Sequence, residues 1–84
     1  MDRTMELVRL NVAEEEGILL KYCLYEETLD SRPSYSIECK YGDESAFLPD
    51  VTSLKERAVE IFELFVKSRV TPISAHDVLE DILP

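Results

Sequence analysis

The sequence predicts an α+β fold: an antiparallel meander of three to four strands, covered on one face by two C-terminal helices. Residues 53–69 carry apolar side chains at helical spacing, and 72–83 repeat this pattern after a proline. The first half of the chain instead alternates apolar and polar residues with the period of a strand. Eighty-four residues fit one domain, so we expect 1–84 to fold as a unit.

The predicted first helix, 53–69, has one apolar stripe. Steps of three and four residues place these side chains on the same face, with charged residues on or beside the opposite face. Ser53 and Glu56 have the spacing of a capping box, although Thr52 and Asp50 are competing caps. We expect the stripe to cover the sheet. Its members are Leu54, Ala58, Ile61, Phe62 and Phe65.

The predicted second helix, 72–83, follows a sharp break. Pro72 disfavours helical geometry at the residue before it, so the first helix must end there. Thr71 as N-cap, with Pro72 at the first helical position, can open the second helix. Ser74 with Asp77 offers an alternative start three residues later. A helix this short is marginal alone, so its stability must come from packing.

Three segments are predicted strands, and a fourth is a candidate. Residues 5–13 alternate imperfectly, 18–27 are rich in β-forming residues, and 35–41 alternate cleanly. Gly17 ends an acidic triplet and marks a hairpin turn between the first two. The segment 46–48 is the candidate fourth strand, which the proline after it would end or hold at an edge.

The alternation also predicts the register of the strands. Each strand must present its apolar set to the helices, because a slip by one residue would turn that set to water. Cys39 then faces the helices and Cys23 the opposite side, so the two thiols cannot form a disulfide within one chain. The predicted pairs are Val12 with Ile18, Leu10 with Leu20, Val8 with Tyr22, Tyr22 with Ile37, and Leu20 with Cys39.

One face of the predicted sheet has no helix to cover it. Leu7, Leu19, Cys23 and Tyr25 fall on that face and would form a small apolar patch. Such a patch on a small domain indicates a surface for self-association or for a protein partner. We therefore predict an interface at these four residues.

The chain is strongly acidic, with 18 acidic and 9 basic residues and a net charge of −9. This charge argues against nucleic acid and against anionic membrane surfaces as partners. It permits a basic protein partner, whose binding would be salt-sensitive. Two cysteines, no signal peptide and no apolar run near the ~20 residues of a membrane span predict a cytoplasmic protein.

No pattern for catalysis, a metal or a cofactor stands out. His76 and Glu80 could share a metal on one helix face, but a zinc site needs three or four ligands and no second histidine exists. Asp77 and Asp81 pair two carboxylates on a short helix that offers no desolvated cleft for acid–base chemistry. Two glycines leave no phosphate loop. We predict that the protein is not an enzyme and holds no cofactor.

The C-terminal tail carries a short motif. It reads Val70-Thr71-Pro72-Ile73, then Asp77-Val78, then a D-x-L-like close at Asp81 to Leu83. This tail resembles the ending of a family of small uncharacterised proteins from Clostridia, a domain of unknown function with N-terminal strands and a helical tail. The resemblance implies a bacterial, cytosolic, one-domain protein and supplies no activity. Thr71, Pro72 and Asp77 match the pattern, and capping explains each of them.

These observations predict a small non-enzymatic regulatory or protein-interaction module that self-associates through the open sheet face or an edge strand. The alternative is a small-molecule-binding protein or an enzyme with a site between the helices and the sheet. Tyr22, Tyr41 or His76 would then be its polar anchors. A third class is an acidic decoy that binds a basic protein.

Overall fold

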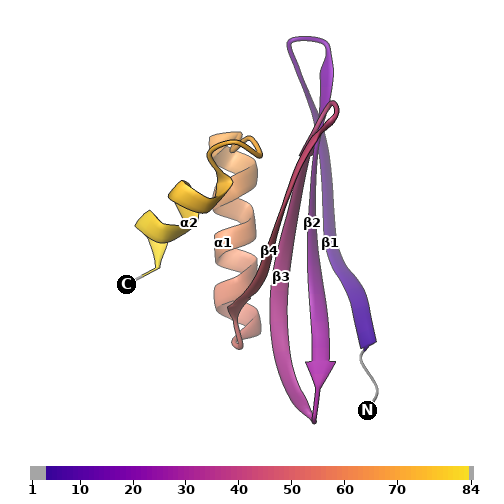
Figure 1. Ribbon diagram of the computed structural model, residues 1–84, viewed down its shortest axis with the longest axis vertical. Coiled ribbons are helices and arrows are strands. Elements are labelled where there is room, and N and C mark those ends of the chain that lie inside the picture. Colours follow the sequence, from indigo (N-terminus) through magenta and orange to yellow (C-terminus); the bar gives the residue numbers. More distant parts are fainter. Residues whose placement is uncertain (1–3, 84) are drawn as a thin grey trace.

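A computed structural model describes residues 4–83 and confirms the predicted α+β meander. Four antiparallel strands follow one another in the order β1-β2-β3-β4, and both helices lie on the same side of the sheet (Figure 1). The elements are β1 (Thr4–Glu15), β2 (Ile18–Leu29), β3 (Arg32–Tyr41), β4 (Glu44–Thr52), α1 (Lys55–Ser68) and α2 (Ala75–Ile82).

The fourth strand exists and runs well beyond 46–48. Pro49 does not end it, because β4 is the edge of the sheet and one side of its backbone needs no partner. Asp50 adopts a left-handed conformation, with φ of 50°, at an irregularity in the pairing with β3. This irregularity lets both Leu48 and Val51 point into the core, where they are buried.

The predicted capping box of the first helix is wrong. Strand β4 continues to Thr52, so α1 begins only at Lys55, and Leu54 is an N-cap without a side-chain hydrogen bond. The Leu54 N–H instead donates to the Thr52 hydroxyl oxygen over 3.2 Å. Ser53, the expected cap, lies in the corner between strand and helix.

The second helix begins at Ala75, three residues later than position 72. Pro72 belongs to a turn in which the Ser74 N–H donates to the Thr71 carbonyl over 3.1 Å. Ser74 is the N-cap, as in the alternative start, but its side chain makes no capping bond. Its hydroxyl donates to the Thr71 carbonyl instead, which stabilises the turn.

The pairing of β2 with β3 keeps the predicted faces, but the register differs by two residues. The segment expected to be a loop is a two-residue turn, in which Asp30 and Ser31 both have positive φ. Such turns match the twist of the flanking strands, so both strands extend to the turn and pair further along. The observed pairs are Leu20 with Tyr41, Tyr22 with Cys39, and Leu24 with Ile37.

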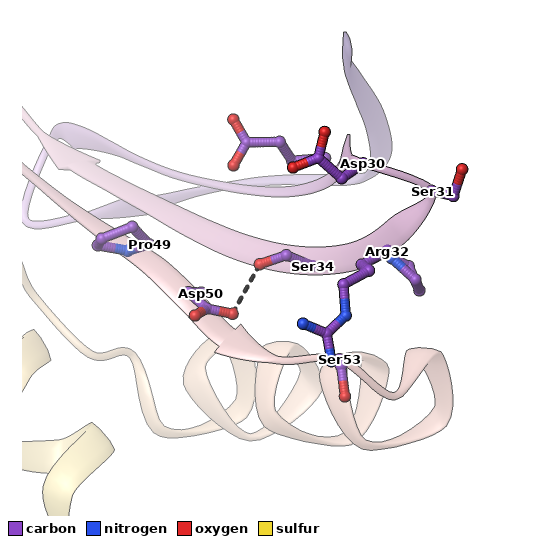
Figure 2. A pocket seen from close by; sticks show the side chains of 9 residues that line it. Asp30, Ser31, Arg32, Ser34, Pro49, Asp50 and Ser53 are labelled. Carbon is purple, nitrogen blue, oxygen red and sulfur yellow. Dashed lines mark hydrogen bonds between the residues drawn. The ribbon is translucent and has the colours of Figure 1, made fainter. Parts of the chain in front are cut away.

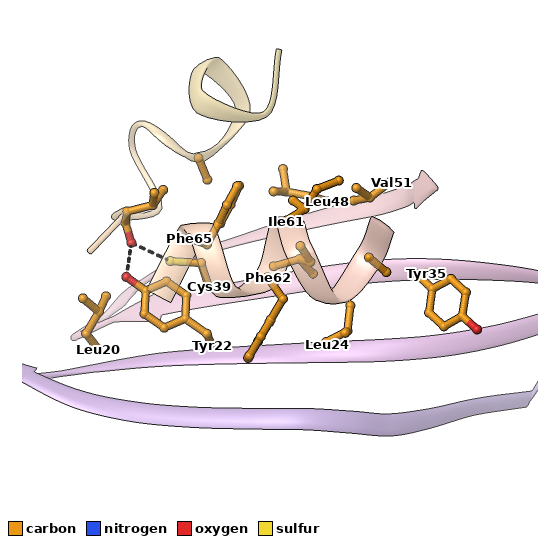
Figure 3. Packing of buried hydrophobic residues seen from close by; sticks show 14 residues of the cluster. Leu20, Tyr22, Leu24, Tyr35, Cys39, Leu48, Val51, Ile61, Phe62 and Phe65 are labelled. Carbon is orange, nitrogen blue, oxygen red and sulfur yellow. Dashed lines mark hydrogen bonds between the residues drawn. The ribbon is translucent and has the colours of Figure 1, made fainter. Parts of the chain in front are cut away.

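The core lies between the sheet and α1, as predicted. Phe62 is 5% exposed and Phe65 is fully buried, and both rest on side chains from the middle of the sheet (Figure 3). Burying one such aromatic side chain stabilises the fold by about 1.5–3 kcal/mol. The sheet and α1 contribute Leu20, Tyr22, Leu24, Ile37, Cys39, Leu48, Val51, Ala58 and Ile61, among others.

Two buried polar groups of the sheet converge on one carbonyl of the link between the helices. The Tyr22 hydroxyl donates to the Val70 carbonyl over 2.6 Å, and the Cys39 thiol donates to the same oxygen over 3.3 Å (Figure 3). Cys39 faces the helices as predicted, Cys23 lies on the other face, and both are free thiols. Burial raises the pKa of the Tyr22 hydroxyl and of the Cys39 thiol, the latter to about 11.

The end of α1 is closed by Arg69, which has a left-handed backbone with φ of 55°. The Val70 N–H donates to the Phe65 carbonyl over 3.1 Å, so the last turn is satisfied as in helices that end in glycine. The Arg69 guanidinium lies 3.8 Å from a carboxylate oxygen of Glu15, and both side chains are about half exposed. This ion pair is therefore worth little.

Replacing Tyr22 with phenylalanine removes one buried hydrogen bond without opening a cavity. We expect Tyr22→Phe to lower the free energy of unfolding by about 1–2 kcal/mol, measured by urea denaturation. Tyr41→Phe is the matched control, because the Tyr41 hydroxyl donates to the Glu15 carbonyl over 3.3 Å at an exposed position. A loss of equal size in both variants would contradict the importance of the Val70 contact.

Arg69→Gly should unfold at a higher urea concentration than Arg69→Ala. Both variants lose the guanidinium, but only alanine keeps the Cβ that strains a left-handed backbone. The expected difference in the free energy of unfolding is about 0.5–1 kcal/mol after the greater freedom of unfolded glycine is subtracted. Equal stability of the two variants would show that the helix end relaxes to another conformation.

The Cys39 thiol makes stability depend on alkaline pH. Its pKa is about 11 when folded, against an ordinary value near 9, so the unfolded chain loses this proton first. Stability from this group is complete below pH 9 and is lost as the pH rises towards 11. In urea titrations from about pH 8 to about pH 11, Cys39→Ala should lose less stability than the parent chain. If the stabilities of the parent chain and of Cys39→Ala fell in parallel as the pH rises, the raised pKa of the Cys39 thiol would be refuted.

Candidate interaction surface

A β-bulge decides which side chains of β1 face away from the helices. The register of β1 with β2 shifts between Leu7 and Arg9, which places Val8 in the bulge. Leu7 lies opposite Tyr25 before the shift, and Leu10 lies opposite Cys23 after it. The extra residue therefore brings apolar residues of odd and even number onto one face.

The predicted register of β1 is wrong for this reason. Leu10 pairs with Cys23 and Val12 with Lys21, rather than with Leu20 and Ile18. Both side chains consequently point away from the helices and are half exposed. Val8, within the bulge, is the member of the predicted set that packs partly against the core.

We call the side of the sheet that no described element covers the open face. The large apolar side chains that are exposed on this face range from 41% exposure for Phe47 to 63% for Leu19. They come mainly from β1 and β2, with Phe47 added from β4, where it pairs with Glu38 of β3. The exposed apolar side chains of this face are Met5, Leu7, Leu10, Val12, Leu19 and Phe47.

The four residues predicted as an interface all lie on the open face. Leu7 and Leu19 are more than half exposed, Tyr25 is half-buried, and Cys23 is buried among its neighbours. The Tyr25 hydroxyl donates to a carboxylate oxygen of Glu38 over 3.2 Å on the same face. Burial and the nearby Cys23 and Glu38 side chains raise the pKa of Tyr25, so it remains a neutral donor.

Sequence reasoning missed the larger part of this surface. Leu10, Val12, Met5 and Phe47 were not in the predicted patch. Simple alternation assigns Leu10 and Val12 to the core, and it carries no sign of the bulge. Phe47 could have been found once β4 was recognised, because Leu48 beside it is buried and neighbours in a strand face opposite sides.

The residues named for a site between helices and sheet do not converge. Tyr22 is buried and binds the Val70 carbonyl, whereas Tyr41 reaches the Glu15 carbonyl near the β1–β2 hairpin. His76 is exposed on α2. Buried apolar side chains occupy the junction between α1 and the strands β2, β3 and β4.

A polar pocket of about 690 Å³ lies at the end of the sheet near the β2–β3 turn (Figure 2). The Ser34 hydroxyl donates to the Asp50 carboxylate over 2.8 Å, and Asp30 and Arg32 also line the pocket. Among residues 4–83, no group of three or more acidic, histidine or cysteine side chains is placed to hold a metal.

Within the described part of the chain, neither helix has the length and apolar content needed to cross a membrane. The fold and its surface define a small α+β domain whose sheet leaves one apolar face bare. The chain belongs to a family of unknown function, DUF6514, whose model matches residues 1–84. This finding agrees with the resemblance to a domain of unknown function. No curated protein and no solved structure matches the chain.

Proposed function

We propose that the protein is a small non-enzymatic interaction module that works as a homodimer, with the open faces of two copies packed together. The observation that carries this proposal is the bulge at Val8. It gathers Leu7, Leu10 and Val12 on the one side of the sheet where the described chain supplies no cover. A regular strand would turn part of this set towards the helices, so the bulge favours an external apolar surface.

The size of the open face suits such a dimer. Four strands about ten residues long span roughly 650 Å², from spacings of ~4.8 Å between strands and ~3.4 Å along them. A stable interface buries about 800 Å² on each partner, and side chains add area to a flat projection. Covering the exposed half of each large apolar side chain contributes about 1 kcal/mol. Two copies cover twelve such side chains, which contribute about 12 kcal/mol and exceed an association cost of about 4 kcal/mol by about 8 kcal/mol, so we expect a micromolar dimer.

The charge distribution favours a second copy over a basic partner at this face. The chain carries −9, so two copies repel each other through most of their surfaces. On the open face, however, Lys21 lies opposite Lys40, and Glu14 and Glu38 lie on the same side. Charge is nearly balanced there, so this face allows two copies to meet with little repulsion.

The proposed setting is the cytoplasm of a bacterium, with Clostridia as the source that the C-terminal motif indicates. Two free, buried cysteines support a reducing compartment, because nothing in the fold depends on a disulfide. A dimer of such small chains would present its helices and acidic surfaces outward, which suits a regulatory role exerted through other proteins.

Charged substitutions on the open face should separate the two copies. We expect sedimentation equilibrium to find a dimer that dissociates at micromolar concentration, and Leu10→Lys and Leu19→Lys to raise its Kd by at least about tenfold. Leu54→Lys is the matched control, because Leu54 is 66% exposed next to α1 and outside the open face. It should dimerise like the parent chain.

Two further measurements separate the alternatives. Circular dichroism and urea denaturation must show that the variants are folded, since an unfolded chain would also fail to dimerise. Salt should leave an apolar dimer unchanged or strengthen it, whereas a basic partner bound to this acidic chain would dissociate. A strict monomer at about 1 mM, or a dimer that survives both open-face substitutions, would refute the proposal.

A further inference from the structure

The helix-facing side of β1 is not covered by α1, which packs chiefly on β2, β3 and β4. A groove of about 440 Å³ remains between β1 and α1. Phe62 and Val66 of α1 form its apolar wall, and Arg9, Leu10 and Asn11 line it from β1. This groove lies on the opposite side of the sheet from the open face, and it runs beside the free edge of β1.

The two edges of the sheet are not equivalent. At the β4 edge, Pro49 lacks an N–H and Asp50 interrupts the regular strand, so a further strand finds no continuous ladder. From Arg9 to Glu15, β1 has a regular register and contains neither proline nor glycine. Alternate backbone N–H and C=O groups of this segment therefore face outward and remain able to pair.

The groove also has an unusual charge for this protein. Arg9 and Lys67 both line it, and neither makes an ion pair with a residue in the range 4–83. The Arg9 guanidinium donates only to the carbonyl of its neighbour Val8, over 3.1 Å. Glu63 is the single acidic residue of the lining, so the groove is net positive on a chain of −9.

We propose that this edge binds an extended segment of a partner protein, which adds a fifth strand beside β1. Main-chain hydrogen bonds to β1 supply affinity, and alternate side chains of the segment enter the groove. An apolar side chain rests on Phe62 and Val66, and a neighbouring carboxylate lies between Arg9 and Lys67. The partner is thus recognised by alternating apolar and acidic residues on one side of an extended chain.

A second copy of β1 does not fit this groove. Beyond the bulge, the helix-facing side chains of β1 are Arg9, Asn11, Ala13 and Glu15, which pair with the helix-facing residues of β2. None of these is a large apolar side chain, so a second β1 would leave the wall of Phe62 and Val66 uncovered. The occupant is therefore not a second β1. Because Leu10 also lines the groove, Leu19→Lys is the open-face variant that tests the dimer independently of this proposal.

The test uses the full chain and a fluorescent peptide of about nine residues. The side chains on the groove-facing side of the peptide are valine, glutamate and valine, and threonine occupies the positions between them. A second peptide carries lysine in place of glutamate. We expect the glutamate peptide to bind at least about tenfold more tightly by anisotropy, and to slow amide exchange of β1 between Arg9 and Glu14. The amides of Leu19 and Phe47, which lie on the open face but outside β1, should be unaffected.

Matched variants locate the site. Arg9→Glu and Lys67→Glu should each weaken binding of the glutamate peptide by at least about tenfold, whereas Lys55→Glu should not. Lys55 undergoes the same charge change at the start of α1, outside the groove. Equal binding of both peptides, no binding at all, an equal loss with Lys55→Glu, or protection outside β1 would each overturn the proposal.

Discussion

The carbonyl of Val70 is the point on which the two layers depend. It accepts hydrogen bonds from Tyr22 of β2 and Cys39 of β3, and all three groups are buried. An unpaired carbonyl at this depth would cost about 1–3 kcal/mol, so the link between the helices is held at one place over the sheet. The left-handed backbone of Arg69 ends α1 and directs the chain so that the Val70 carbonyl lies at this place.

The spacing of apolar residues in the sequence was sufficient to predict the two layers, but it did not predict how the strands pair. Phe62 and Phe65 lie on the middle strands because helical spacing places them on one stripe, and this prediction is confirmed. The register between β2 and β3 depended on the turn at Asp30 and Ser31. These residues adopt positive φ without being glycine, so an ordinary polar loop was the simpler interpretation of this segment.

The four residues predicted as an interface lie on the open face, but the prediction named too few of the apolar side chains that are exposed there. Leu7, Leu19 and Tyr25 follow from alternation alone, because their positions do not depend on the bulge. Leu10 and Val12 depend on it entirely, since one inserted residue exchanges the two faces. No glycine marks this bulge, and β1 alternates too loosely to locate it.

The groove beside α1 could not be predicted for a related reason. It exists because α1 packs over three strands and leaves the first uncovered, and a helix position across a sheet is not encoded in its own periodicity. Arg9 gains its interest only after the bulge, which turns it towards Lys67 and Phe62. From the sequence around it, Arg9 is predicted to be only a solvent-exposed charged residue.

The irregular backbone around Pro49 and Asp50 has a consequence for crowded solutions. Because that side of the sheet accepts no neighbour, sideways growth is limited to the other side and stops after one addition. A continuous filament needs two sheet edges on every subunit that can each pair with a neighbouring strand. In this chain only the edge at β1 can pair in this way. The native protein can therefore have a long, apolar first strand without forming fibres.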